Sequence, residues 1–162
     1  MIAGYVDTRG NNGITLSKKE FYNLGLVVAK EIYEYCPESE LAYKKWLGIF
    51  GHRNNAYGTN WVNLGLCAVF TSIYVKYYRY QESHGFDAIC DIFGYTVMAL
   101  SFIKSIAPHL SITRNDFLEF SIDDVKILMW DNKYIKIEEA NSLFLSIFRG
   151  VMNEHSNMHS NI

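Results

Sequence analysis

The sequence predicts an all-α fold, a compact bundle of about six helices, and two observations favour it. Apolar residues recur at spacings of three and four along most of the chain, which is the period of an amphipathic helix. Capping and helix-terminating residues separate these segments and leave only short connections between them. The chain has 162 residues and 49% hydrophobic residues, enough for one domain with a sizeable core.

The first predicted helix begins after Ser17 and carries its apolar residues on one face. Ser17 and Glu20 form a capping box, in which each side chain can bond a backbone N–H that the first turn leaves free. We expect this helix to end near Tyr35, because Pro37 disfavours helical geometry in the residue before it.

A second, short helix is expected from Glu38 to Leu47. Gly48 and Gly51 follow it, and glycine commonly ends a helix. The segment from 52 to 59 is rich in asparagine and glycine, so we expect a loop there.

Two long apolar helices are predicted next, over residues 60–82 and 86–107. The first is apolar nearly all round, which indicates a central place in the bundle. The apolar run of each is shorter than the roughly 20 residues of a membrane span, so we expect no membrane association. Trp46 and Trp61 are flanked by apolar residues at helical positions and are expected to be buried.

The last third of the chain mixes signals. Ser121 and Asp124 form a capping pair, which predicts a helix that runs to Trp130. Residues 134–137 are compatible with one short strand, and residues 138–151 have a helical pattern.

Three parts are therefore expected along the chain. Residues 1–16, with their glycines and asparagines, predict a flexible N-terminal arm. Residues 17–152 would form a single helical domain, and residues 153–162 a polar, frayed tail.

Charge is distributed unevenly along the chain, although the formal net charge is only −2. Residues 41–81 contain five Lys or Arg and no Asp or Glu, whereas residues 1–40 and 82–162 have local balances of −2 and −5. An acid-free stretch suits contact with a polyanion, since carboxylates would repel phosphates. Burial in a core gives the same pattern, and both interpretations stay open at this stage.

Signatures of catalysis are missing from the sequence, and we expect a protein that is not an enzyme. It contains no phosphate-binding loop, dinucleotide fingerprint or nucleophile elbow. His155 and His159 are four residues apart but lie in the predicted polar tail, and the three Cys lack paired spacing. We therefore expect no metal and no cofactor. Few cysteines and no secretory signal predict a cytoplasmic location.

Tyrosines gather on one predicted helix beside basic residues. The set expected to bind a partner is Tyr74, Tyr77, Tyr78 and Arg79. Aromatic side chains are enriched in protein interfaces, so we expect a homo- or hetero-oligomer. Stacking on the bases of a nucleic acid is the alternative use of aromatics among basic residues.

A series of short motifs appears in one order along the chain. The motifs are Leu24-Gly25, Tyr43-Lys44, Gly48, Gly51, Thr59-Asn60-Trp61, Gly85, Phe86-Asp87-Ala88-Ile89, the segment Asp123–Trp130 and Lys133-Tyr134-Ile135. In this order they resemble the FlhC family, the flagellar master activators and their relatives on mobile elements. The resemblance covers about two thirds of the chain, and its weight lies in the order of the motifs.

The resemblance implies an all-α transcriptional activator that binds DNA together with a small, dimeric FlhD-like partner. The family carries four zinc-binding Cys after its last helix, whereas residues 137–162 contain none. The zinc site is therefore expected to be absent, which puts the DNA contacts that depend on it in doubt.

Candidate DNA contacts come from the second predicted helix and the loop after it. Lys44 and Lys45 would contact phosphates, while the same helix packs inward through Leu41, Trp46 and Leu47. The residue types that can read bases in the following loop are Arg53, Asn54 and Asn55.

A second function class stays open beside the regulator. Toxin-neutralising immunity proteins and phage inhibitors are small, mildly acidic and free of catalytic motifs, as this chain is. In such a non-enzymatic protein-binding inhibitor, the acidic C-terminal half would face a basic target.

Overall fold

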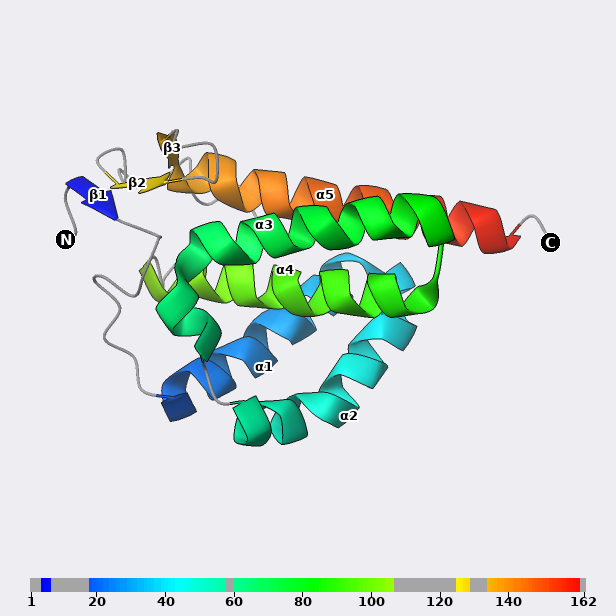
Figure 1. The fold of residues 1–162 in the computed structure, drawn as a ribbon, viewed down its shortest axis with the longest axis horizontal. Coiled ribbons are helices and arrows are strands. Elements are labelled where there is room, and N and C mark those ends of the chain that lie inside the picture. The colour runs from blue at the N-terminus through cyan, green and yellow to red at the C-terminus, as the bar shows by residue number, and fades with distance from the viewer. Residues whose placement is uncertain (1–3, 7–17, 58–59, 107–124, 129–133, 161–162) are drawn as a thin grey trace.

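Five α-helices surround a common core in the described part of the chain, with a small sheet at one end (Figure 1). The computed structural model describes residues 4–6, 18–57, 60–106, 125–128 and 134–160, with side chains described for 19–20, 22–49, 69, 71–105 and 139–157. The helices are α1 (Lys18–Tyr35), α2 (Glu40–Tyr57), α3 (Asn60–Ser83), α4 (Phe86–Ile106) and α5 (Ile137–Ser160). The predicted helical fold class is confirmed for these residues.

The first helix ends where the sequence predicts. α1 buries one face through Val28, Ala29 and Ile32, at helical spacing. Pro37 then begins the short 3-10 helix η1 (Pro37–Ser39), and the buried Ser39 hydroxyl donates to the carbonyl oxygen of Cys36 at 2.7 Å. This bond ties down the turn that leads from α1 into α2.

The predicted end of the second helix is wrong. α2 continues through Gly48 and Gly51 to Tyr57, so residues 52–57 are helical rather than a loop, and 58–59 lie outside the described residues. Glycine inside a helix costs only about 1 kcal/mol relative to alanine, and no proline follows to stop the helix. A helix already held by its buried residues can therefore extend through both glycines.

α3 and α4 match the predicted boundaries closely, and a sharp corner joins them. His84 takes the left-handed conformation with φ 52°, and its backbone N–H donates to the carbonyl of Tyr80 at 2.8 Å. The backbone N–H of Gly85 donates to the Ser83 hydroxyl oxygen at 3.2 Å. These bonds satisfy backbone groups at the end of α3 and allow α4 to begin at Phe86.

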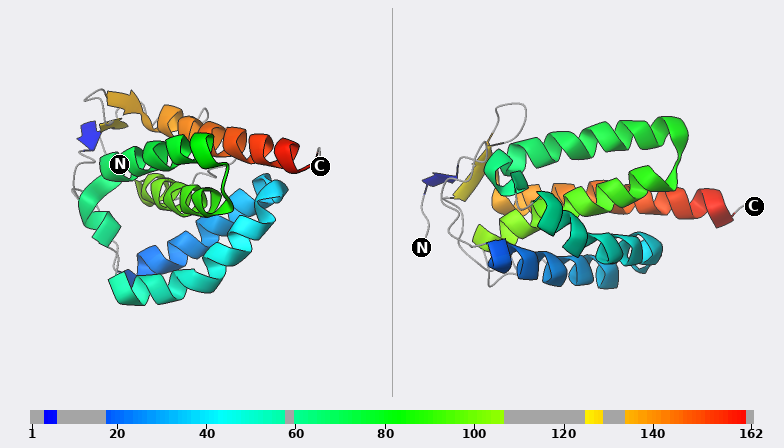
Figure 2. Two further views of the ribbon diagram at one scale, coloured as in Figure 1. Left: turned by 45° about the vertical axis from the view of Figure 1, so that its right-hand side comes forward. Right: turned by 60° about the horizontal axis from the view of Figure 1, so that its bottom comes forward.

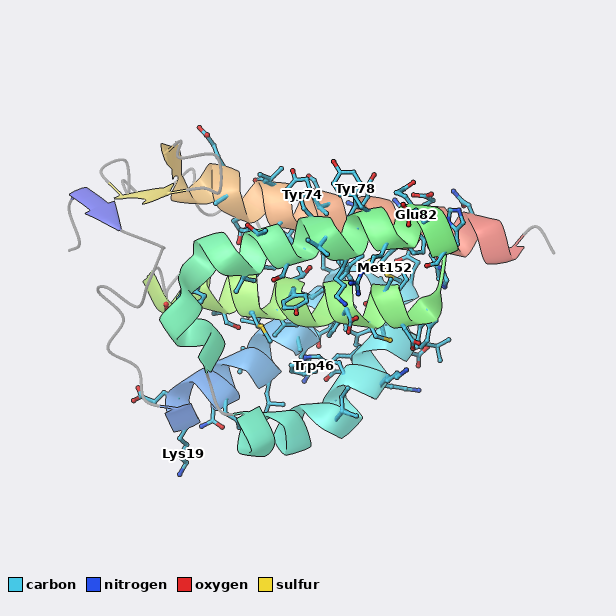
Figure 3. The ribbon with its side chains drawn as sticks, in the orientation of Figure 1. Lys19, Trp46, Tyr74, Tyr78, Glu82 and Met152 are labelled. Carbon is cyan, nitrogen blue, oxygen red and sulfur yellow. The ribbon has the colours of Figure 1, made fainter. Side chains whose placement is uncertain are left out.

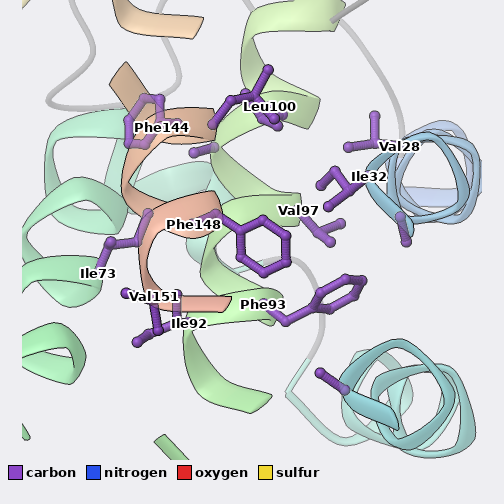
Figure 4. Close-up of a cluster of buried hydrophobic side chains, with 14 of the residues drawn as sticks. Val28, Ile32, Ile73, Ile92, Phe93, Val97, Leu100, Phe144, Phe148 and Val151 are labelled. Atoms are coloured by element: carbon purple, nitrogen blue, oxygen red, sulfur yellow. The ribbon is translucent and has the colours of Figure 1, made fainter. Parts of the chain in front are cut away.

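α4 is the central helix of the bundle, so the central place predicted for the helix over residues 60–82 is wrong. That helix, α3, packs mainly on α4 and leaves one side exposed to solvent. α4 contacts α1, α2, α3 and α5, and Figure 2 shows it between the α1–α2 pair and the two helices α3 and α5. The close-up in Figure 4 shows α4 side chains meeting those of α1, α3 and α5 in one apolar cluster. Phe93 is fully buried at this point, with its ring centroid 5.7 Å from that of Phe148 on α5 and 5.8 Å from that of Trp46 on α2.

The prediction that the apolar run of residues 86–107 is too short for a membrane span is wrong, because α4 over Phe86–Ser105 has the length and composition of one. In its most apolar part, 61% is buried inside the bundle. The neighbouring helices that bury it account equally well for its apolar composition.

Among the side chains that the structure describes, three ion pairs tie α4 to its neighbours. Lys104 pairs with Glu31 of α1, Asp87 with Lys45 of α2, and Asp91 with Lys76 of α3. The pair between Lys104 and Glu31 is the most buried of the three, since the side chains are 15% and 24% exposed.

A three-stranded sheet closes one end of the bundle. Strands β1 (Gly4–Val6) and β2 (Val125–Leu128) are parallel, and β2 pairs antiparallel with β3 (Tyr134–Lys136). The helix predicted from Ser121 to Trp130 is therefore wrong for residues 125–128, which form β2. In this segment β-branched residues alternate with Lys126, and the segment pairs with a strand on each side. Part of the expected N-terminal arm is likewise a strand.

The last helix is longer than predicted. α5 runs to Ser160, so residues 153–160 of the expected frayed tail are helical. His155 accounts for the order of this segment, because its Nδ1 lies 3.2 Å from the hydroxyl of the buried Tyr80. Its ring also stacks on that of Phe86. Contacts to α3 and α4 therefore anchor a sequence that looks polar in isolation.

Candidate interaction surfaces

The two predicted phosphate-binding lysines lie on the exposed side of α2, and each has an acidic partner. Lys44 pairs with Glu40 at 2.9 Å, and the hydrogen bond that its ammonium group donates to this carboxylate raises the pKa of Lys44. Lys45 pairs with Asp87 of α4 at 3.2 Å, and its Nζ lies 5.5 Å from the centre of the Phe86 ring. Lysines in the acid-free window of residues 41–81 are thus paired with carboxylates from outside this window.

The predicted orientation of α2 is right for one residue and wrong for two. Trp46 is buried as expected and points toward α4, where a Cβ placed on Gly94 would lie 3.5 Å from its Cδ1 (Figure 3). Leu41 and Leu47 do not pack inward, since their side chains are 70% and 44% exposed. The inner face of α2 is formed instead by Ala42 and Trp46, which are both buried.

The remaining predicted DNA contacts lie on the last turns of α2 rather than in a loop. They are Arg53, Asn54 and Asn55, and their side chains are outside the described set, as is that of Trp61.

The predicted partner-binding residues lie on α3, and the tyrosines among them contact each other. The rings of Tyr77 and Tyr78 meet edge to face with centroids 5.8 Å apart, and those of Tyr74 and Tyr78 are 6.5 Å apart. Tyr74 and Tyr77 are half-buried against the core, whereas Tyr78 is 64% exposed. The structure therefore brings together an aromatic cluster with one ring turned to solvent.

A row of exposed residues on α3 was missed by the sequence analysis. It consists of Thr71, Val75, Tyr78 and Glu82, and we call it the α3 stripe. Figure 3 labels two members of the stripe, Tyr78 and Glu82, which follow one another along α3 on the side turned away from α1 and α2. Tyr74, also labelled there, is a neighbour of the stripe. Successive members are four, three and four residues apart, a spacing that places them on one side of a helix. This spacing is the only feature of the sequence that could have indicated the row. It was hidden because apolar residues are spread around α3 without one dominant apolar face.

A thiol is buried at the junction of α1 and η1. Cys36 is 2% exposed, and its Sγ donates to a carboxylate oxygen of Glu38 at 3.2 Å. Burial, followed by the hydrogen bond and negative charge of Glu38, raises the pKa of the Cys36 thiol to about 12. A nucleophilic cysteine needs a lowered pKa, so this environment has the opposite effect.

This raised pKa predicts a pH-dependent loss of stability. The thiol contributes fully below its ordinary pKa of 9.0, and the contribution is lost as pH rises from about 9 toward 12, because the unfolded chain ionises first. Urea unfolding of the wild type and Cys36→Ala at pH 8 and pH 10.5 measures the effect. Between pH 8 and pH 10.5 we expect the wild type to lose more stability than the variant. Equal losses would contradict the raised pKa of the Cys36 thiol.

The corner between α3 and α4 holds a second polar cluster. The Tyr80 ring contacts both His84 and His155 edge to face, with centroids 5.3 and 5.8 Å apart. Burial raises the pKa of the Tyr80 hydroxyl, and the charge of Glu154 adds to this effect. Glu154 accepts a hydrogen bond from Gln81 of α3 at 3.2 Å. These contacts join α5 to α3, which is a structural role.

Among the described residues, no group of three or more His, Cys, Asp or Glu could hold a metal ion. In comparisons with known proteins, no family model, curated protein or solved structure matches this chain. The FlhC-family resemblance therefore stays a prediction from the sequence.

Proposed function

We propose that this chain is a cytoplasmic, non-enzymatic regulator that acts by binding protein through the tyrosine cluster of α3. The observation that carries the proposal is Tyr78, a large aromatic side chain that is 64% exposed and lies beside the 46% exposed Val75. Tyrosine is enriched in interface hot spots, because it supplies contact area with few rotatable bonds. Its contacts with Tyr74 and Tyr77 restrict the ring further before any partner arrives.

Affinity capture from the native host tests this proposal. The bait carrying Val75→Ser and Tyr78→Ser is expected to lose the protein that the wild-type bait retains. A matched control is Leu41→Ser, which removes an apolar side chain from α2 that is at least as exposed as those of Val75 and Tyr78. Retention by the double variant, or loss by the control alone, would refute a binding role for the α3 cluster.

A second candidate is DNA-associated transcriptional regulation in a complex with a small FlhD-like partner. The acid-free window of residues 41–81 supports it, together with the solvent-exposed positions of Lys44 and Lys45. Exposed ion pairs contribute only about 0–1 kcal/mol, so phosphates can displace Glu40 and Asp87 at little expense.

The salt dependence of DNA binding distinguishes this candidate. Each phosphate contact contributes about 0.9 to the slope of log affinity against log salt concentration. The triple variant Lys44→Ala, Lys45→Ala, Arg53→Ala should therefore flatten the slope by about three units, measured on the complex with its partner. Wild-type affinity and slope in this variant would remove the three residues from any DNA contact.

A further inference from the structure

The α3 stripe has the spacing of a coiled-coil seam. Its four residues are all exposed and follow one another at steps of four, three and four, which is how core positions repeat in two packed helices. Val75 and Tyr78 form the apolar centre, and Thr71 and Glu82 lie at the two ends. A single helix with this seam is suited to pair with another helix of similar spacing.

The charges on and beside the stripe favour a partner surface without net charge. Arg79 and Glu82 are both exposed, and neither makes an ion pair with any residue whose side chain the structure describes. One cation and one anion leave the face without net charge. A strongly acidic or basic partner would therefore gain little, whereas a surface with this same composition is complementary to it.

We infer that the α3 stripe pairs with the α3 stripe of a second copy of this chain, with the two helices antiparallel. The inference rests on the proposed function in one respect, that this face of α3 binds protein, and it names the partner. Interfaces of this self-complementary kind are usual in homodimers.

The antiparallel orientation follows from Glu82. In a parallel pair, Glu82 would lie against Glu82 of the second copy, and like charges in contact oppose association. With a two-fold axis near residues 76 and 77, Val75 instead lies against the second copy's Tyr78. Glu82 then lies against the second copy's uncharged Thr71. The two Arg79 side chains lie on opposite sides of the two-fold axis, separated from each other along the helices.

The stripe is short, which sets the expected strength of pairing. From residue 71 to residue 82 a helix rises about 16 Å, or roughly three turns. Such a contact is smaller than the standard protein interface of about 800 Å² per partner. We therefore expect a monomer–dimer equilibrium that depends on concentration rather than a permanent dimer.

Sedimentation equilibrium of the full chain over a wide concentration range tests the pairing. The wild-type mass is expected to rise from 18.7 kDa toward twice that value as concentration increases. Tyr78→Glu places two carboxylates in the apolar centre and should weaken dimerisation about tenfold or more. Leu41→Glu is the matched control, since it adds the same charge at an exposed position on α2 and should dimerise like the wild type.

The outcomes separate this inference from the proposed function. A wild type that is monomeric at every concentration overturns the inference, and so does a dimer that Tyr78→Glu leaves unchanged. If the chain is monomeric while its captured partner still depends on Val75 and Tyr78, only the proposed function stands. Circular dichroism of each variant confirms that the helices are intact.

Disulfide cross-linking tests the orientation. When Val75→Cys and Tyr78→Cys chains are mixed and oxidised, the mixed dimer should exceed either homodimer, because these positions face each other across the axis. The unmodified chain, which keeps its native cysteines, is the background control. Efficient cross-linking of each variant with itself, and none between them, would overturn the antiparallel arrangement.

Discussion

Replacing Phe93 by alanine is expected to lower the free energy of unfolding by about 3–5 kcal/mol, the usual loss for a buried phenylalanine. Phe93 lies on the central helix and is fully buried. Its ring meets Trp46 and Tyr43 on α2 and Phe148 on α5, so one cavity would loosen three helices together. A typical domain is stable by only 5–15 kcal/mol, which makes this a large share of the total.

Urea denaturation followed by circular dichroism measures the loss. Phe93→Leu is the first control, because it keeps most of the volume and should cost much less than the alanine variant. Tyr78→Ala is the second, since it removes an aromatic ring of similar size from an exposed position. If Phe93→Ala and Tyr78→Ala destabilise the chain equally, the central position of α4 is wrong.

The helix boundaries that the sequence predicted well are those marked by local chemistry. Pro37 ends α1 at Tyr35 because its ring acts on the residue just before it. The end of α3 is similarly local, although His84 takes the left-handed conformation that glycine usually adopts. Signals of this kind depend only on neighbouring residues, so they can be recognised without knowing the fold.

The boundaries that failed depend on contacts between distant segments. Val125–Leu128 became strand β2 because β1 and β3 flank it, and β1 comes from the other end of the chain. The polar segment after Asn153 stays helical because His155 reaches Tyr80, which is 75 residues away in sequence. Local propensity is a weak guide wherever such partners decide the conformation.

The candidate surfaces were predictable to different degrees. The tyrosine cluster of α3 could be identified because its residues are close together in the sequence, although which ring faces solvent could not. The ion pair of Lys45 with Asp87 could not be foreseen, since the two residues are 42 positions apart. An acid-free window in the sequence therefore does not imply an acid-free surface, and this weakens the charge argument for DNA.

Glu31 and Lys104 form a pair whose two members depend on each other. Lys104 Nζ donates to Oε1 of Glu31, while Oε2 is buried and makes no hydrogen bond with the described residues. Removing the lysine would leave a carboxylate in a poorly solvated place with no cation beside it. Breaking a fully buried pair costs about 3–5 kcal/mol, and partial solvent access here reduces the expected loss for Lys104→Met to about 2 kcal/mol.

The double variant Lys104→Met, Glu31→Leu shows whether the loss comes from the stranded charge. Two apolar side chains of similar size bury no charge, so we expect the double variant to be more stable than Lys104→Met and close to the wild type. Urea denaturation of the wild type, both single variants and the double variant completes the cycle. Losses that simply add would show that the two side chains act independently, and α4 would then be held to α1 by apolar packing alone.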